Sequence, residues 1–359
     1  MKFQISYKDP IIRLLLSTEP KIKILVRLFI LIIIIAPIVA SWSNGSFLNP
    51  SLKLDALHDI GYITQFALFL PFLILFLPFY INGLTVALND LEKGSVISFS
   101  EEDIRSLSNY ASNIVNSFFF RLLPYAIPTI IVIFLFSVYQ LGGHGSWNSP
   151  SPSSSMTIPA LLSPLPALVL YFVIIALILH IILNYFVIKQ LPWEAIRIQP
   201  MHPDGCGGIS PLGNFSLRLT KAGIFIGLLC LLGVWANVKQ YGLSLYSLEN
   251  SLIIVSYISG LSIAFFLPLL PARKKMIEVK KRMLAQIATC FHENFFDALA
   301  KIDSGDLDSS RMEHLESAKK MYDYAKKMPV FPFNATNISR FYGSVLWPLI
   351  LIFLSKLFK

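Results

Sequence analysis

Six long apolar stretches constrain this chain more than any other feature of its sequence. A helix needs about 20 predominantly apolar residues to cross roughly 30 Å of hydrocarbon. A seventh stretch, residues 341–358, is shorter and has Pro348 at its middle, so the sequence leaves open whether it crosses a bilayer or lies in the interface. The stretches that reach the required length are residues 24–42, 62–82, 119–140, 164–188, 221–238 and 251–271.

The composition agrees with a membrane environment. The 359 residues are 55% hydrophobic and 14% charged, whereas soluble domains average about 45–50% apolar and about 25% charged. Charge depletion of this size means that lipid is the solvent for a large part of the chain. Mixed charges over residues 1–23, without a prompt small-residue cleavage site, indicate a retained first span rather than a signal peptide. We therefore predict an all-α, polytopic transmembrane helix bundle of six or seven spans.

The basic residues predict which ends of the spans face the cytoplasm. Lys and Arg gather in the first 27 residues, in 189–221 and directly after the sixth span, whereas 43–60 and 239–250 carry one each and 141–160 carries none. Cytoplasmic loops of membrane proteins carry such an excess. We therefore predict a cytoplasmic N-terminus. The net charge of +9 follows from this topology, so no nucleic-acid partner is expected.

The longest polar part of the chain follows the sixth span. Two runs with apolar residues at three- and four-residue spacing flank the turn-forming sequence DSGDLDSS and predict a cytoplasmic antiparallel helical hairpin. The sequence MPVFPFN then ends the second helix, because proline cannot sit inside it. The apolar positions are Ile287, Phe291, Phe295, Ala298, Leu299 and Ile302 in the first helix, and Met312, Leu315, Ala318, Tyr322 and Ala325 in the second.

Within the 83–117 loop, Ser100 precedes an acidic cluster and is well placed to cap a short helix.

The sequence thereby divides the chain into four predicted parts. The parts are residues 1–23 as a cytoplasmic N-terminal segment, 24–271 as the six-span bundle with cytoplasmic loops 83–117 and 189–220, 272–335 as the hairpin, and 341–358 as a C-terminal helix that is membrane-inserted or interfacial.

The stretch MHPDGCGGIS in the 189–220 loop is the most unusual polar motif. Its His, Asp and Cys could bind a metal ion or act in catalysis, but ligands so close in a loop rarely face one ion, and no further ligand is evident. Its glycine amides could bind a phosphate, although neither a P-loop spacing nor a strand precedes them. A tight turn capped by Asp204 is the third interpretation, and we favour it; it requires positive φ at Gly207 or Gly208. We call this motif the HPD loop. Its candidate functional residues are His202, Asp204, Gly205, Gly207 and Gly208.

Taken with its context, this motif resembles the THPD-x-x-GGL loop of a family of uncharacterised multi-pass bacterial membrane proteins. The stretch FLPFLILFLPFYINGLTVAL is similar to the second span of that family, GSWNSPS to its external loop, and MPVFPFN to its Pro-aromatic-Pro-Phe break. Met201 replaces a usual Thr, and Ser210-Pro211 replaces a usual Gly-Phe. The resemblance implies a polytopic protein of the bacterial inner membrane and implies no reaction.

Polar side chains inside the predicted spans form a second candidate site. His180 and Asn184 lie one turn apart on one face of the fourth span, and Gln65 lies in the second. Such residues are costly in a membrane, so a polar track for an ion or proton is the functional interpretation. Hydrogen bonding between helices is the structural one, and Arg121 near the start of the third span is expected to snorkel to the cytoplasmic interface.

A basic cluster directly follows the sixth span. Each such charge near anionic headgroups contributes about 1 kcal/mol of attraction. With apolar residues interleaved, the helix is expected to leave the bilayer along its surface. The residues expected to contact lipid headgroups are Arg273, Lys274, Lys275, Lys280, Lys281 and Arg282.

Three classes of function remain open from the sequence. Prolines inside several spans, together with His180 and Asn184, favour a channel- or transporter-like permeation unit. A non-enzymatic scaffold or signalling component, docking a cytoplasmic protein through the HPD loop and hairpin, is nearly as well supported. A membrane enzyme is disfavoured, because no nucleophile–base pair or metal set is evident. We therefore expect no enzymatic activity and no cofactor, with the lipid bilayer as one partner and a second copy or a cytoplasmic protein as another.

Overall fold

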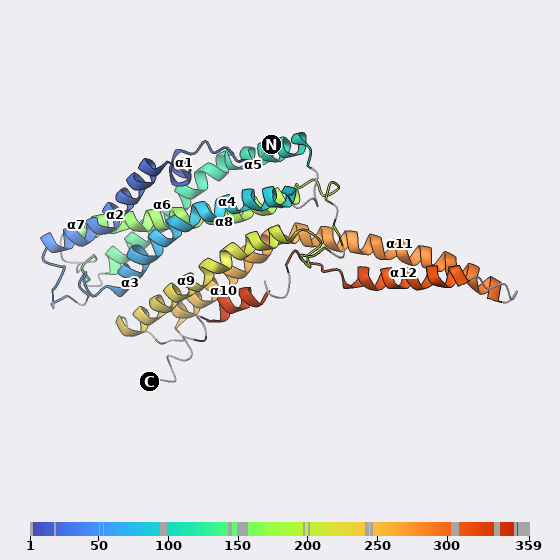
Figure 1. Ribbon diagram of the computed structural model, residues 1–359. Coiled ribbons are helices and arrows are strands. Elements are labelled where there is room, and N and C mark those ends of the chain that lie inside the picture. The colour runs from blue at the N-terminus through green and yellow to red at the C-terminus, as the bar shows by residue number, and fades with distance from the viewer. Residues whose placement is uncertain are drawn as a thin grey trace.

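The computed structural model is helical almost throughout the part that it describes. Among these residues there is no strand, and the bridge between Leu54 and Ser146 is isolated. Figure 1 shows the helices running lengthwise, side by side, in one elongated bundle. The described residues are 3–17, 19–49, 51–52, 54–93, 99–142, 146–148, 157–196, 198–199, 202–240, 244, 247–302, 309–333, 338–347 and 350.

Among the described residues, six helical segments are long and apolar enough to cross a membrane, which confirms the all-α bundle and six of the six or seven predicted spans. Their apolar side chains remain largely exposed on the outside of the bundle, as lipid-facing helices require. The segments contain α2 (Pro20–Ser43), the continuous run of α3 (Ile60–Tyr62), η1 (Ile63–Phe69) and α4 (Leu70–Lys93), then α6 (Phe118–Gly142), α8 (Pro164–Lys189), α9 (Ser210–Gln240) and α10 (Leu248–Phe266).

Several helices extend beyond the apolar runs that predicted them. The α4 helix continues to Lys93 and α9 begins at Ser210, so the loops predicted at 83–117 and 189–220 are shorter than expected. After α10, the short η2 (Leu267–Leu269) leads directly into α11 (Leu270–Ile302). Hydropathy marks where hydrocarbon ends, whereas backbone hydrogen bonds continue until a breaking residue stops them.

Within the 83–117 region, the predicted cap is confirmed. The Ser100 hydroxyl accepts from the Asp103 amide at 3.1 Å, and the Asp103 carboxylate accepts from the Ser100 amide at 3.0 Å. This reciprocal capping box starts α5 (Glu101–Val115). The helix lies at the same end of the bundle as the N-terminus and the hairpin (Figure 1).

The hairpin predicted after the sixth span is present as α11 and α12 (Ser309–Lys327), which lie side by side and project from the bundle (Figure 1). Its seam differs from the one that the apolar spacing indicated. Ala298, Leu315 and Ala325 are buried, whereas Phe295 is 38% exposed and stacks on Phe291 instead. Spacing identifies a face of a helix, but small side chains set how closely two helices approach.

The chain returns to the bundle after α12, which ends at Lys327 before the predicted Pro329–Pro332 break. The Pro332 carbonyl packs so close to Gly213 that a Cβ there would overlap it. Residues 338–347 are helical and pack inward, because Phe341 stacks on Phe265 at 4.4 Å between ring centroids. Most of the predicted 341–358 helix beyond residue 347 lies outside the described residues.

Candidate functional site

The HPD loop is organised around one carboxylate. Asp204 Oδ1 accepts from the amides of Cys206 at 2.8 Å and Gly208 at 3.0 Å, and Oδ2 accepts from the Ser210 amide at 3.1 Å. His202 Nδ1 lies 2.8 Å from Asp204 Oδ1 and 3.3 Å from the Asp204 amide nitrogen. Partial burial opposes ionisation, but these donors prevail and hold the pKa of Asp204 at about 2. Asp204 thus caps the first turn of α9.

The glycines of this loop have the backbone that the turn interpretation predicts. Gly205, Gly207 and Gly208 have φ of 64°, 73° and 90°. At Gly207 a Cβ would also lie 2.6 Å from Ile198 Cγ2, and the Gly207 carbonyl accepts from the Gln199 amide at 3.1 Å. The loop therefore links the chain that leaves α8 to the start of α9 with little space to spare.

The other chemistries considered for this loop gain no support from its geometry. Of the glycine amides that a phosphate would need, that of Gly208 already donates to Asp204 and that of Gly205 to the His202 carbonyl. Cys206 is 1% exposed, and burial with the nearby Asp204 charge raises the pKa of its thiol to about 11, so it is not a thiolate at neutral pH. Across the described chain, no group of three or more His, Cys, Asp or Glu side chains is placed to hold a metal ion.

The intramembrane polar residues occupy two separate places. His180 and Asn184 of α8 are 1% and 2% exposed and face the interior. Gln65 instead lines a cavity near the other end of the bundle, together with Tyr171 of α8. From Tyr171 to His180 is a distance of about 13 Å along the helix, and Phe172, Val173 and Ala176 between them are buried apolar residues. The structure does not join the three predicted residues into one track.

We call Tyr7, Tyr80, His180 and Asn184 the inner polar cluster. His180 Nδ1 donates to the Ala176 carbonyl at 2.6 Å, which leaves Nε2 as an acceptor. The Tyr7 ring lies 5.7 Å from the His180 ring, and the Tyr80 hydroxyl lies close enough to Asn184 to interact with it, though without good hydrogen-bond geometry. Among the described residues, no partner satisfies Tyr7 Oη, Tyr80 Oη, His180 Nε2 or Asn184 Nδ2.

Tyr7 reaches this cluster from an extended N-terminal strap, residues 3–9. Its alternate amides donate to a row of side chains on α5: Gln4 to Ser108 Oγ at 3.3 Å, Ser6 to Ser112 Oγ at 3.0 Å and Lys8 to Asn116 Oδ1 at 2.7 Å. Two strand residues advance about 6.7 Å and four helix residues about 6 Å, so the two repeats match. Part of the predicted cytoplasmic segment 1–23 is therefore bound to the bundle.

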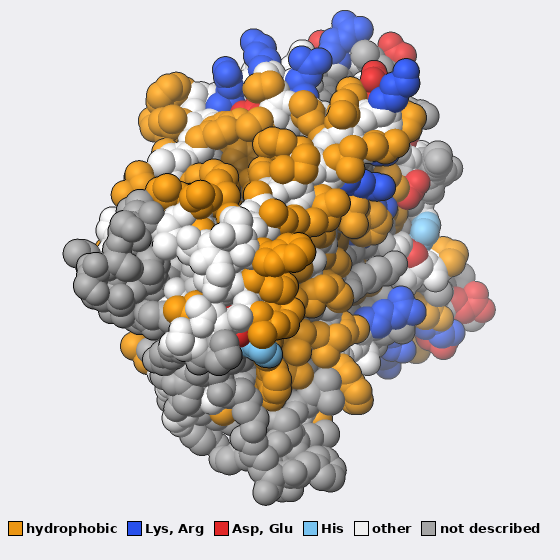
Figure 2. Space-filling view, turned by 90° about the vertical axis from the view of Figure 1, so that its left-hand side faces the viewer, with side chains coloured by type: hydrophobic (Ala, Val, Ile, Leu, Met, Phe, Trp, Pro, Cys, Tyr) orange, Lys and Arg blue, Asp and Glu red, His pale blue; other side chains and the backbone are white. Residues whose placement is uncertain are grey.

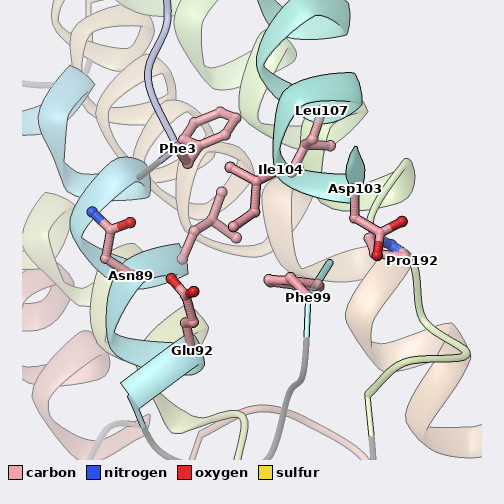
Figure 3. A pocket seen from close by; sticks show the side chains of 9 residues that line it. Phe3, Asn89, Glu92, Phe99, Asp103, Ile104, Leu107 and Pro192 are labelled. Carbon is pink, nitrogen blue, oxygen red and sulfur yellow. The ribbon is translucent and has the colours of Figure 1, made fainter. Parts of the chain in front are cut away.

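The opposite face of the strap packs into the protein. Figure 3 shows Phe3 beside Ile104 and Leu107 of α5, with the Glu92 and Asp103 carboxylates at the rim. The cavity left there is about 10 Å³, which is hardly enough for one water molecule. It seats the strap rather than a ligand. The alternation of apolar and polar residues in FQISYKD was a signal from which an extended segment could have been predicted.

The cavity that contains Gln65 was not predicted, and we call it the outer cavity. Its volume is about 250 Å³. The backbone beside it is a π-helix, η1, in which the Leu70 amide donates to the Gln65 carbonyl. Pro71 explains this shift, because it has no amide to donate and its ring would clash with the carbonyl four residues earlier. Such π-turns are frequent at functional sites.

One acidic side chain stands at the wall of the outer cavity. Asp59 Oδ1 accepts from the Tyr62 amide at 2.8 Å, and Oδ2 accepts from Trp147 Nε1 at 2.9 Å. Burial raises the pKa of Asp59, and these hydrogen bonds oppose the shift. Trp147 is 2% exposed and is anchored by its amide to the Leu54 carbonyl at 2.9 Å. Figure 2 views the molecule from this end, where hydrophobic side chains flank a patch of uncharged polar atoms.

The basic cluster after α10 has partners within the protein. The Arg273 guanidinium lies 4.6 Å from the centroid of the Phe331 ring, Lys280 Nζ donates to the Met328 carbonyl at 2.7 Å, and Lys275 pairs with Glu278 at 2.9 Å. These three bind the returning chain or a neighbouring acid, in addition to any contact with lipid. Lys274, Lys281 and Arg282 are exposed on α11.

The chain matches no known protein family, no curated protein and no solved structure. Its function is therefore inferred from the geometry of its own residues.

Proposed function

We propose that this integral membrane protein is a channel- or transporter-like permeation unit. The observation that carries the proposal is the inner polar cluster, whose four polar groups are buried without a satisfied hydrogen bond to any described residue. Leaving a buried polar group unpaired costs a few kcal/mol, so an arrangement with several such groups needs a compensating role. Water, an ion or a polar solute passing through the bundle would satisfy them.

The positions of the two polar sites support a gated path. The outer cavity and the inner polar cluster both involve α4 or its π-helical start and α8, and an apolar segment of α8 separates them. The strap covers the inner polar cluster through Tyr7, and Phe120 of α6 packs edge-on against His180 at 5.5 Å. In this conformation both the apolar segment and the strap oppose permeation, so opening requires their movement.

We propose that the strap, α5, the HPD loop and the hairpin face the cytoplasm of a bacterium and that the outer cavity faces the other side. These segments share one end of the bundle (Figure 1), and Lys and Arg are concentrated there. Labelling the exposed Cys290 tests the orientation, whereas the buried Cys206 cannot serve. An impermeant maleimide added outside intact cells should leave Cys290 unmodified, and external labelling would contradict the orientation.

The geometry of the HPD loop supports, as a further proposal, membership in the family whose THPD-x-x-GGL loop it resembles. One aspartate reaches the amides two, four and six residues ahead. Glycines with positive φ make that path possible. The spacing between Asp204 and the pair Gly207-Gly208 therefore has a structural reason, because it lets one carboxylate reach three backbone amides. We propose no catalytic role for it.

Flux through proteoliposomes tests the permeation proposal. Vesicles containing the protein should pass small cations or polar solutes faster than protein-free vesicles, and removal of residues 1–9 should increase the rate. Asn184→Leu should reduce flux about tenfold or more, since it removes a buried polar group from the path. Ser137→Ala is the matched control, because Ser137 is exposed on α6 and bonds only to the Ile133 carbonyl. Absence of flux in both the full-length and the strap-deleted protein would overturn the proposal.

A scaffold function is the second candidate, and the hairpin favours it. Phe296, Met312 and Met321 are 62%, 51% and 59% exposed on a pair of helices that projects from the bundle (Figure 1). Apolar side chains exposed on a polar hairpin indicate a protein-binding surface. Loss of a copurifying partner or of self-association on Phe296→Asp, with flux unchanged, would favour this function over permeation.

A further inference from the structure

We propose that the outer cavity binds a small organic ammonium cation. The proposal rests on the permeation function and names the class of its substrate. It starts from the charge of the cavity wall. Among the described residues that line the cavity, Asp59 is the only charged one, and no Lys, Arg or His is among them. A buried carboxylate without a cationic side chain beside it attracts a cationic ligand.

The Asp59 carboxylate is fixed in place but retains capacity to bind. The Tyr62 amide donates to Oδ1, Trp147 Nε1 donates to Oδ2, and the Gly61 amide also donates to the carboxylate. An ionised carboxylate can accept about four hydrogen bonds, which leaves room for a ligand. Its nearest basic neighbour in sequence, His58, is directed to Asp55 at 2.8 Å. The three donors hold Asp59 at the N-terminus of α3 without neutralising its charge.

The rest of the wall selects an organic ammonium over a metal ion. Four aromatic side chains line the cavity, Tyr62, Phe66, Phe136 and Tyr171, and aromatic faces attract ammonium groups that carry alkyl substituents. Gln65, Asn148 and Asn237 add uncharged acceptors. A divalent metal would instead require several oxygen ligands around one point, and Asp59 is the one acidic group among the described residues that line this space.

The size of the cavity limits the ligand to a small one. Its volume of about 250 Å³ is below the range of about 300–1,000 Å³ that is typical of drug-sized ligands. A trimethylammonium group with a short polar substituent fits this description, because its head can meet the carboxylate and aromatic rings while the substituent meets the amides.

Equilibrium binding by the full-length protein in nanodiscs tests this inference. The probes are choline and its neutral isostere, in which carbon replaces the quaternary nitrogen, with titration followed by calorimetry. Choline should bind at least about tenfold more tightly than the isostere, and Asp59→Asn should remove this preference. Asp55→Asn is the matched control, since Asp55 is a neighbouring acid that pairs with His58 outside the cavity, and it should bind choline as the wild type does.

A second variant keeps the inference testable if Asp59→Asn fails to fold. Tyr171→Leu retains the carboxylate and removes an aromatic wall, and it should weaken choline binding about three- to tenfold. Equal affinity for choline and the isostere, or competition by sodium or potassium that matches choline in strength, would overturn the inference. Choline binding without flux contradicts the permeation function alone, whereas flux without choline binding contradicts only the ammonium site.

Discussion

The HPD loop and the inner polar cluster differ in whether their polar groups have hydrogen-bond partners. In the loop, one carboxylate accepts from three backbone amides and lies 2.8 Å from His202 Nδ1. In the inner polar cluster, four polar groups are buried and find no satisfying partner among the residues that the structure describes. The motif that is most conspicuous in the sequence forms a structured turn, and the less conspicuous residues are the ones that retain unused hydrogen-bonding capacity. Several reactive residue types close together in the sequence, as in the HPD loop, are a weaker indication of a functional site than buried polar atoms without hydrogen-bond partners.

The largest effect is expected where the loop has least freedom. Gly207→Val combines a φ of 73° with a Cβ placed 2.6 Å from Ile198 Cγ2, so it should destabilise the protein by about 3 kcal/mol or more. Thermal unfolding in detergent should show a Tm lower by on the order of 10 °C. Gly205→Asn is the control, because the same backbone region there has open space around it and Asn tolerates it.

If Gly207→Val were as stable as Gly205→Asn, the loop would have to be free to rearrange. The HPD loop would then not be rigid, and the comparison with the inner polar cluster would no longer hold.

The second effect concerns the charge at the centre of the loop. Asp204→Ala leaves three amides without their acceptor and should cost about 2 kcal/mol. The folded-state pKa of about 2 lies below the ordinary value of 3.8, so the stabilisation is complete above about pH 4 and is lost as the pH falls toward 2. Unfolding measured across this range should show an acid-dependent loss in the wild type that is smaller in Asp204→Ala.

His202→Ala separates the histidine from the amides in this effect. Because the amides remain bound to Asp204, most of the acid dependence should persist in His202→Ala. An acid profile of Asp204→Ala that matches the wild type would show that other carboxylates dominate.

The parts that could be predicted from the sequence are those governed by near neighbours. The six spans follow from local hydropathy, the Ser100 cap from a four-residue pattern, and the positive φ of Gly207 from the demands of a tight turn. The candidate sites depend on distant pairs instead. Asp59 meets Trp147 88 positions away, and Lys8 meets Asn116 108 positions away. No periodicity in one segment specifies such partners, so the outer cavity and the strap were missed.

A smaller effect is expected where the strap covers the inner polar cluster. Asn116 accepts from the Lys8 amide at 2.7 Å and donates to the Ser6 carbonyl at 2.8 Å, both at exposed positions. Asn116→Ala should therefore cost only about 1 kcal/mol, but that cost falls on the strap. Hydrogen exchange at the amides of residues 4–8 should accelerate about fivefold. Asn113→Ala, an exposed asparagine on the same helix, should leave exchange unchanged, and acceleration in both variants would mean that α5 itself had loosened.

The smallest effect on stability, and the one of opposite sign, is expected inside the inner polar cluster. Asn184 and Asn250 are both buried, at 2% and 0% exposure. Asn250 Nδ2 donates to the Ser244 carbonyl at 2.8 Å and its Oδ1 accepts from Asn237 at 2.9 Å. Asn184 Nδ2, by contrast, has no partner with good hydrogen-bond geometry among the described residues. Replacing a satisfied asparagine removes hydrogen bonds, and Asn250→Leu should cost about 1–2 kcal/mol. Replacing an unsatisfied one removes a penalty, so Asn184→Leu should leave stability unchanged or raise it by up to about 1 kcal/mol. Thermal unfolding of the two variants side by side decides the matter. If Asn184→Leu were destabilised as much as Asn250→Leu, the Asn184 amide would be paired in the bilayer, and the inner polar cluster would hold helices together rather than serve a permeating species.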